Sequence, residues 1–317
     1  MNDYKLRSIN LDLVKYYEIN LKDISPITLK TYKLVSDNNN NFFLKETSKT
    51  ILNKYHYLEN IGVSNVLYPI LNKENKYVSS NNNQFFYVTD YINEVKIRDD
   101  VKSSALFYEL ENLHNRTIIK KTLDPFKARI KFDEITNQLD YKFKSIESYV
   151  RQVESKPLNM FSMPILENYY LILEAKKELV KLQKRLISSI KSRESVNYNF
   201  IHNNPSLDHI LNVRGQNYLI SLDKSKIGLD SLDYAKYYIS NNFINVDYKT
   251  LILNHYDSDA YSFNYDYFKY LILYIYIMKI NFTNEQQVNA RNFENVAINI
   301  SKFNNDFLDN KKQTSQP

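Results

Sequence analysis

Glycine is scarce in this chain of 317 residues. Only three glycines occur, Gly62, Gly215 and Gly228, whereas average usage would give roughly 22. Walker-type and dinucleotide-binding phosphate loops need several closely spaced glycines, so both motifs are excluded. Asn, Lys, Ile and Tyr are abundant, and AT-rich codon usage explains most of this bias.

Cysteine is absent, which excludes a disulfide framework and a thiolate metal site. The polar start at residues 1–5 does not resemble a signal peptide. The most apolar stretch, Tyr270–Met278, is too short to span a bilayer. We therefore expect a cytoplasmic protein without a membrane span.

The net charge of +6 permits an anionic partner but does not require one. Lysines are interleaved with acidic residues, whereas nucleic-acid-binding proteins usually cluster their basic residues. We do not expect nucleic-acid binding. The lysine-rich segment at residues 176–191 keeps an anionic-surface or nucleic-acid binder as a third hypothesis.

The first third of the chain has the pattern of a sheet. Residues 31–36 and 42–45 are rich in aromatic and β-branched residues and flank an Asn-rich turn, which predicts a hairpin. The other expected elements here are a helix at 48–60, ended by Gly62, and strands at 65–71, 76–79 and 84–91.

The rest of the chain is mainly helical. Apolar residues at helical spacing predict two long helices, 127–153 and 168–191, which should form an antiparallel pair. Further helices are expected at 102–114, 232–242, 248–255, 265–280 and 288–303, and short strands at 198–202, 210–213 and 218–222. The pattern predicts an α+β fold in two lobes. We expect a β-rich N-lobe at 1–92, a helical C-lobe at 93–309 that includes the pair at about 127–191, and a disordered tail at 310–317.

One polar loop and the hairpin after it carry the most informative residues. The loop contains His202, Asn204 and His209, and the hairpin is followed by Ser221 and Asp223. This segment resembles the aminoglycoside-phosphotransferase superfamily, a branch of the protein-kinase-like fold, and within it the CotS-type spore-coat proteins. Nothing in these residues by itself indicates sporulation.

The resemblance assigns a place to each polar residue. His202 matches the first His of the family's His-Gly-Asp-x-His-x-x-Asn loop, where its role is structural, and Asn204 stands where the catalytic Asp belongs. His209 stands at the metal-binding Asn, and Ser221 at the metal-binding Asp. The family's Gly and buried Asp that follow this last position match Gly228 and Asp233, which supports the register.

The resemblance also implies a nucleotide site in the first third of the chain. Lys45 is similar to the third-strand lysine that pairs with nucleotide phosphates. Tyr91 and Ile92 fall in the hinge between lobes, where they would contact a nucleotide. Residues 110–114, Leu-Glu-Asn-Leu-His, are similar to a helix end of this family.

The departures from the family motif affect the catalytic base, the metal ligands and the acidic partner of the lysine. The amide of Asn204 cannot accept a proton, and loss of a positioned base costs about 10²–10⁴ in rate. Ser221 offers a neutral oxygen where Mg²⁺ prefers a carboxylate, and the His209 imidazole suits softer metals. Ile51 stands where an acidic partner for Lys45 is expected.

These replacements favour a pseudokinase that requires no cofactor and acts by binding or scaffolding an unidentified protein partner. ATP and Mg²⁺ remain candidate ligands. The alternative is an active ATP-dependent phosphotransferase for a small molecule, of the aminoglycoside or choline kinase type. It would need Asp223 as a metal ligand and Asp208 as a displaced base. A zinc site at His202 and His209 is disfavoured, because neither Cys nor an acidic residue at fixed spacing accompanies them.

Overall fold

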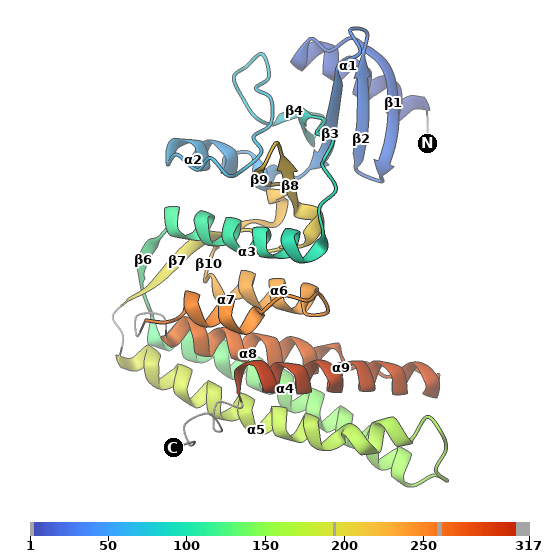
Figure 1. Cartoon of the computed structure of the whole chain (residues 1–317), viewed down its shortest axis with the longest axis vertical. Coiled ribbons are helices and arrows are strands. Elements are labelled where there is room, and N and C mark those ends of the chain that lie inside the picture. Colours follow the sequence, from blue (N-terminus) through green and yellow to red (C-terminus); the bar gives the residue numbers. More distant parts are fainter. Residues whose placement is uncertain (1–2, 193–194, 259–261, 309–317) are drawn as a thin grey trace. The chain divides into compact units, whose positions relative to one another are not determined.

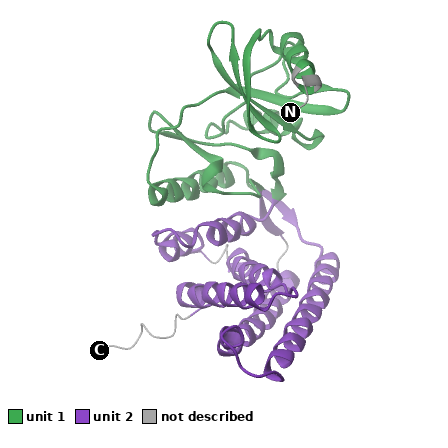
Figure 2. Cartoon of the chain, turned by 90° about the vertical axis from the view of Figure 1, so that its right-hand side faces the viewer, with its two compact units in different colours: residues 1–118, 200–227 green, residues 119–199, 228–317 purple. Residues whose placement is uncertain are grey.

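The computed structural model describes residues 3–192, 195–258 and 262–308 (Figure 1). The chain divides into two compact units, residues 1–118 with 200–227 and residues 119–199 with 228–317 (Figure 2). The first unit therefore contains more than the segment 1–92 predicted as the N-lobe, and the lobe boundary at residue 92 stays a prediction. The predicted tail at 310–317 lies outside the described residues.

A five-stranded antiparallel sheet forms the centre of the first unit, in the order β1-β2-β3-β5-β4 (Figure 1). Its strands are β1 (Leu21–Thr28), β2 (Thr31–Ser36), β3 (Asn41–Thr47), β4 (Ser79–Asn81) and β5 (Gln84–Asp90). Strands β2, β3 and β5 confirm the prediction, which rested on their aromatic and β-branched residues. Strand β1 is mostly exposed and contains Pro26, so its sequence carries no such signal.

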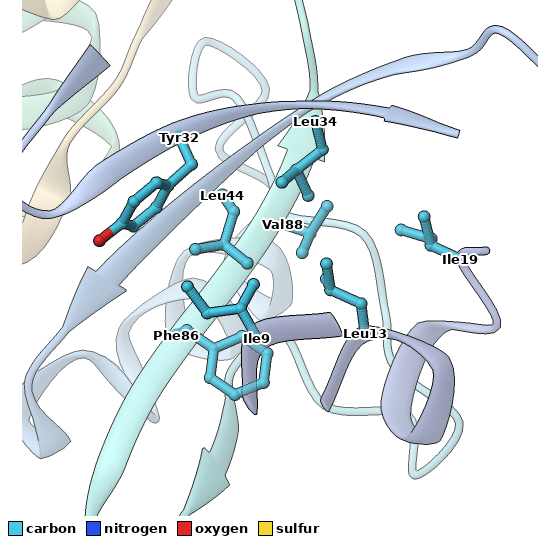
Figure 3. Packing of buried hydrophobic residues seen from close by; sticks show 8 residues of the cluster. All are labelled: Ile9, Leu13, Ile19, Tyr32, Leu34, Leu44, Phe86 and Val88. Atoms are coloured by element: carbon cyan, nitrogen blue, oxygen red, sulfur yellow. The ribbon is translucent and has the colours of Figure 1, made fainter. Parts of the chain in front are cut away.

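Helix α1 (Asp3–Tyr17) contributes to the core of this unit, although the sequence pattern does not predict the helix. Ile9 and Leu13 of α1, with Ile19 just after it, pack in one buried cluster with strand residues (Figure 3). The strand residues of the cluster are Tyr32, Leu34, Leu44, Phe86 and Val88. The cluster fixes β3, and with it Lys45, because Leu44 is fully packed.

Three predictions for the segment after β3 differ from the structure. The helix expected at 48–60 is interrupted, with a short 3-10 turn η1 (Lys49–Ile51) before helix α2 (Lys54–Asn60). The strand expected at 65–71 is an extended segment with one isolated bridge, between Val66 and Leu219. The strand expected at 76–79 begins only at Ser79. Gly62 has a φ of +73°, which confirms its predicted left-handed conformation after the helix.

The remainder of the first unit places a hairpin beside helix α3 (Asp99–Arg116). The elements are η2 (Leu207–His209), β8 (Ile210–Val213), β9 (Gln216–Leu219) and η3 (Leu222–Lys224). Arg214 and Gly215 join β8 to β9, and both have positive φ, as a two-residue hairpin turn requires. The hairpin confirms the prediction, except that β9 ends at Leu219 rather than Leu222. The short strand β10 (Lys226–Gly228) follows.

The second unit is mostly helical. Its elements are β6 (Ile119–Thr122), α4 (Pro125–Glu154), α5 (Met163–Ser192), β7 (Ser195–Ile201), α6 (Ser231–Asn241), α7 (Tyr248–His255), α8 (Ser262–Lys279) and α9 (Gln286–Phe307). Helices α4 and α5 form the predicted pair, and α5 also packs against α8 and α9 (Figure 1). Asp124 caps α4 by accepting from the amides of residues 126 and 127. None of the helices in the described ranges is long and apolar enough to cross a membrane.

Candidate functional site

A cavity of about 190 Å³ lies within the first unit, between the sheet and the β8–β9 hairpin. Aromatic and aliphatic side chains make up most of its lining, with Thr89, Asp90 and Ser221 as polar members. The lining residues are Ile27, Phe43, Tyr55, Leu67, Tyr87, Thr89, Asp90, Tyr91, Ile92, Leu211, Ile220 and Ser221. Tyr91 and Ile92 are therefore part of the cavity wall, and their predicted role in nucleotide contact stays a prediction.

Lys45 does not line this cavity but contacts Ser221, which does. Its Nζ atom is 2.6 Å from Oδ2 of Asp223 and 3.1 Å from Oγ of Ser221. The side chains of Lys45 and Asp223 are only 18% and 22% exposed. The hydroxyl of Thr47, two residues along β3, donates to Oδ1 of Asp223. Alternate residues of one strand point to the same face, so β3 delivers both groups to a single carboxylate.

The ionisation of Asp223 follows from these contacts. Burial alone would raise the pKa of the carboxyl, because it disfavours the charged form. The ammonium of Lys45 and the hydrogen bonds from Lys45 and Thr47 outweigh burial and hold the pKa of Asp223 below its usual value. The carboxylate is therefore charged at neutral pH, and it balances the charge of Lys45.

A second lysine holds the backbone that carries Asp223. Nζ of Lys54, the first residue of α2, donates to the carbonyls of Asp223 (3.0 Å), Ser225 (2.6 Å) and Leu222 (3.5 Å). Burial lowers the pKa of Lys54, and the charge of Asp223 opposes that shift. Ser221, just before the turn, adopts the left-handed region with φ 62° and ψ 47°. The sharp change of direction at Ser221 lets the following 3-10 turn present Asp223 to β3.

The loop with Asn204 forms a separate hydrogen-bonded cluster. The backbone N–H of Asn204 donates to Nδ1 of His202 (3.3 Å), which leaves Nε2–H of His202 to donate to the carbonyl of Ile220 (2.8 Å). Nδ1 of His209 donates to the carbonyl of Asn204 (2.6 Å). Lys224 Nζ is 3.5 Å from Oδ1 of Asn204. These bonds hold the His202 ring within the loop, and its predicted structural role stays a prediction.

The His209 ring is held within the loop by its neighbours. Burial lowers its pKa, and although the hydrogen bond to Asn204 opposes this, the net shift favours the neutral ring. Nδ1 is already used by the carbonyl of Asn204. The ring stacks on His202 with centroids 5.3 Å apart. These contacts hold the ring in the loop. The neutral ring is the form that can bind a metal ion, so the predicted place of His209 at the metal-binding position stays a prediction.

Within residues 3–192, 195–258 and 262–308, no three His, Cys, Asp or Glu side chains are grouped closely enough to hold a metal ion. Asp223 is the carboxylate that pairs with Lys45, and Ser221 adds only a neutral hydroxyl. A cation carried by nucleotide phosphates needs only one or two protein carboxylates, and Asp223 would be the residue to meet it.

The structure thus divides the predicted site residues into three groups, of which Tyr91 and Ile92 in the cavity wall are one. Lys45, Ser221 and Asp223 interact directly, and His202, Asn204 and His209 form the adjoining loop. The charges of both Lys45 and Asp223 act on His209. Sequence reasoning missed Thr47 and Lys54. Thr47 could have been found from its same-face spacing to Lys45, whereas nothing local distinguishes Lys54 from other lysines.

Solved structures share this architecture, although no family model and no curated protein matches the sequence. An aminoglycoside phosphotransferase from Alicyclobacillus acidocaldarius superposes with a TM-score of 0.65, at 11% identity over 92% of each chain. The AMP-bound spectinomycin phosphotransferase gives 0.50 at 14% identity over 94% of this chain and 90% of that one. Amicoumacin kinase in complex with AMP-PNP and Ca²⁺ gives 0.50 at 14% identity over 94% of both chains.

These likenesses show the fold: an α+β chain with an N-terminal sheet region and a helical C-terminal region, as in aminoglycoside phosphotransferases and kinase-like proteins. The expected fold class is confirmed. The relation to CotS-type proteins stays a prediction.

Proposed function

We propose that this protein is a pseudokinase that binds an adenine nucleotide without needing a divalent cation and acts through a protein partner. The observation that carries the proposal is the apolar, aromatic cavity, one of whose lining residues, Ser221, is hydrogen-bonded to Lys45. A flat base fits between apolar walls, and an ammonium next to a lining residue of the cavity suits phosphate. Two structures with this fold hold AMP and AMP-PNP.

The loop around Asn204 supports the absence of catalysis. The residue at the expected base position is an amide, which cannot take a proton from an attacking hydroxyl. Asp208, the candidate for a displaced base, is exposed on η2. The carboxylate of Asp223 is already paired with the ammonium of Lys45. Each of these features lowers the rate of phosphoryl transfer, whereas none prevents a nucleotide from binding.

Thermal unfolding with millimolar ATP tests the proposal, with either Mg²⁺ or EDTA present. A ligand at 100 times its Kd stabilises the fold by about 2.7 kcal/mol, which should raise the Tm by roughly 5 °C in both conditions. Lys45→Ala should remove the shift, and Lys49→Met, a change at an exposed lysine of η1, should keep it. No shift with any nucleotide would disprove the nucleotide site.

The second candidate function is an active small-molecule phosphotransferase. It is favoured by one observation, the charged carboxylate of Asp223 beside Lys45. It requires metal-dependent turnover that Lys45→Ala abolishes, and metal-dependent ATP binding that Asp223→Ala abolishes. Turnover of ATP with a hydroxylated acceptor at enzymatic rates would replace the pseudokinase proposal with this one.

A further inference from the structure

Helix α2 makes an unusual contact with the turn that carries Asp223. The ammonium of Lys54 meets three backbone carbonyls of that turn, from Leu222, Asp223 and Ser225. An ammonium has three donor hydrogens and no acceptor, so three converging carbonyls match its capacity. The carbonyl of Leu222 also accepts from the amide (3.0 Å) and hydroxyl (2.6 Å) of Ser225. The turn is thus bonded both within itself and to α2.

The same turn aims the Asp223 side chain at strand β3. Its two oxygens meet Lys45 and Thr47, while its backbone carbonyl meets Lys54. At the position where the kinase resemblance calls for an acidic partner to Lys45, the chain has Ile51, which is fully buried. The segment after β3 thus supplies no carboxylate from that position. It supplies the ammonium of Lys54, which binds the turn that carries the carboxylate of Asp223.

We propose that Lys54 is a positioning residue that holds Asp223 against Lys45, in the place that a nucleotide phosphate would otherwise take. Both a carboxylate and a phosphate oxygen are anionic acceptors for the same ammonium. A phosphate that approaches Lys45 without a cation therefore competes with Asp223. The competition rests on the proposed nucleotide site, but the hold of Lys54 on the turn can be measured without any nucleotide.

The first measurement is hydrogen exchange at the amides of residues 221–225 in the protein without nucleotide. Hydrogen bonds from a charged donor are among the stronger ones, so Lys54→Met should speed exchange at the Ser225 amide about ten-fold. Lys54→Arg keeps a charged donor and should restore most of the protection. Lys49→Met, at an exposed lysine five residues earlier, is the matched control and should exchange as the wild type does.

The second measurement is ATP affinity in EDTA, by calorimetry. Asp223→Asn removes the competing charge and should tighten ATP binding about three- to ten-fold. Lys54→Met should tighten it by a similar factor, because it releases the same carboxylate. In the Asp223→Asn background Lys54→Met should add nothing. A purely structural role for Lys54 would not produce that dependence on Asp223.

The outcomes separate this inference from the proposed function. The role of Lys54 is overturned if Lys54→Met leaves the hydrogen exchange of residues 221–225 unchanged. It is also overturned if Lys54→Met weakens ATP binding by the same factor in the wild-type and the Asp223→Asn backgrounds. Absence of ATP binding in both the wild type and Asp223→Asn overturns the nucleotide site and the competition, while exchange still decides whether Lys54 holds the turn. If Lys54→Met does not fold, Lys54→Gln, with a shorter neutral donor, should give intermediate exchange, and wild-type exchange there would count against the proposal.

Discussion

Lys45 and Asp223 form a pair of charges that are mostly withdrawn from water. The pair itself contributes little net stability, because desolvation offsets much of the attraction. Removing one partner is costly, since the other charge is then left poorly solvated. Lys45→Met should therefore lower the free energy of unfolding by about 1–3 kcal/mol in urea titrations. The double variant with Asp223→Asn should recover part of this loss, and a double variant as unstable as the sum of both would contradict the pairing.

The lowered pKa of Asp223 also predicts how stability depends on pH. A carboxyl whose folded pKa lies below the unfolded value, about 3.9, stabilises the fold above that value, and the stabilisation is lost as pH falls through the folded pKa. The stability difference between wild type and Asp223→Asn should stay constant from about pH 7 to 5 and shrink below about pH 4. Urea unfolding of both proteins across this range measures it. A difference that does not change below pH 4 would mean that Asp223 is not paired.

At the scale of elements, the α4–α5 pair shows that the spacing of apolar residues predicts which face of a long helix is buried. The stripe on α5 that includes Leu182 is buried, as its spacing of three and four residues predicts. Helix α2 shows the limit of the same argument. Apolar residues at helical spacing continue from 51 to 58, although the helix is broken between η1 and α2. Ile51 of η1 and Leu58 of α2 are both buried, so the spacing predicts burial here but not a continuous helix.

Two substitutions on α5 test the packing of the pair. Leu182 is fully buried, so Leu182→Ala should lower the free energy of unfolding by about 2–5 kcal/mol through the cavity that it leaves. Val180, two residues earlier, is 45% exposed, and Val180→Ala should change stability by no more than about 0.5 kcal/mol. Denaturant unfolding compares the two, and equal losses would show that α5 does not bury the Leu182 face.

Element boundaries were less predictable than element types. Strand β1 lacks alternation because most of its side chains are exposed on both faces. The segment at 65–71 is rich in apolar residues, yet it does not pair along its length with one strand. The Leu67 amide donates to the Leu219 carbonyl, whereas the Ile70 amide donates to the Val88 carbonyl. A sequence pattern indicates which residues are buried, but it does not indicate which segments are joined by backbone hydrogen bonds.

At the scale of the whole molecule, the net charge of +6 invites a test of nucleic-acid binding. Several lysines are already engaged locally, as in the pair of Lys181 with Glu178 on α5. Because phosphate contacts dominate such affinity, we expect no gel shift of DNA or RNA at about 150 mM salt with micromolar protein. A retarded band at that salt concentration would revive the third hypothesis and direct mutagenesis to residues 176–191.

The sequence by itself determined the fold class, most helices, the strands β2, β3 and β5, and the residues at the family's motif positions. Those features depend on the spacing of apolar residues and on short motifs, both of which involve residues close together in the sequence. Only the tertiary structure decided what these residues do together. Lys45 and Ser221 are 176 residues apart, and the lysine at position 54 gains its role only because the turn at 222–225 folds against α2. Such contacts are set by how the sheet and the hairpin pack, and no spacing in the sequence records them.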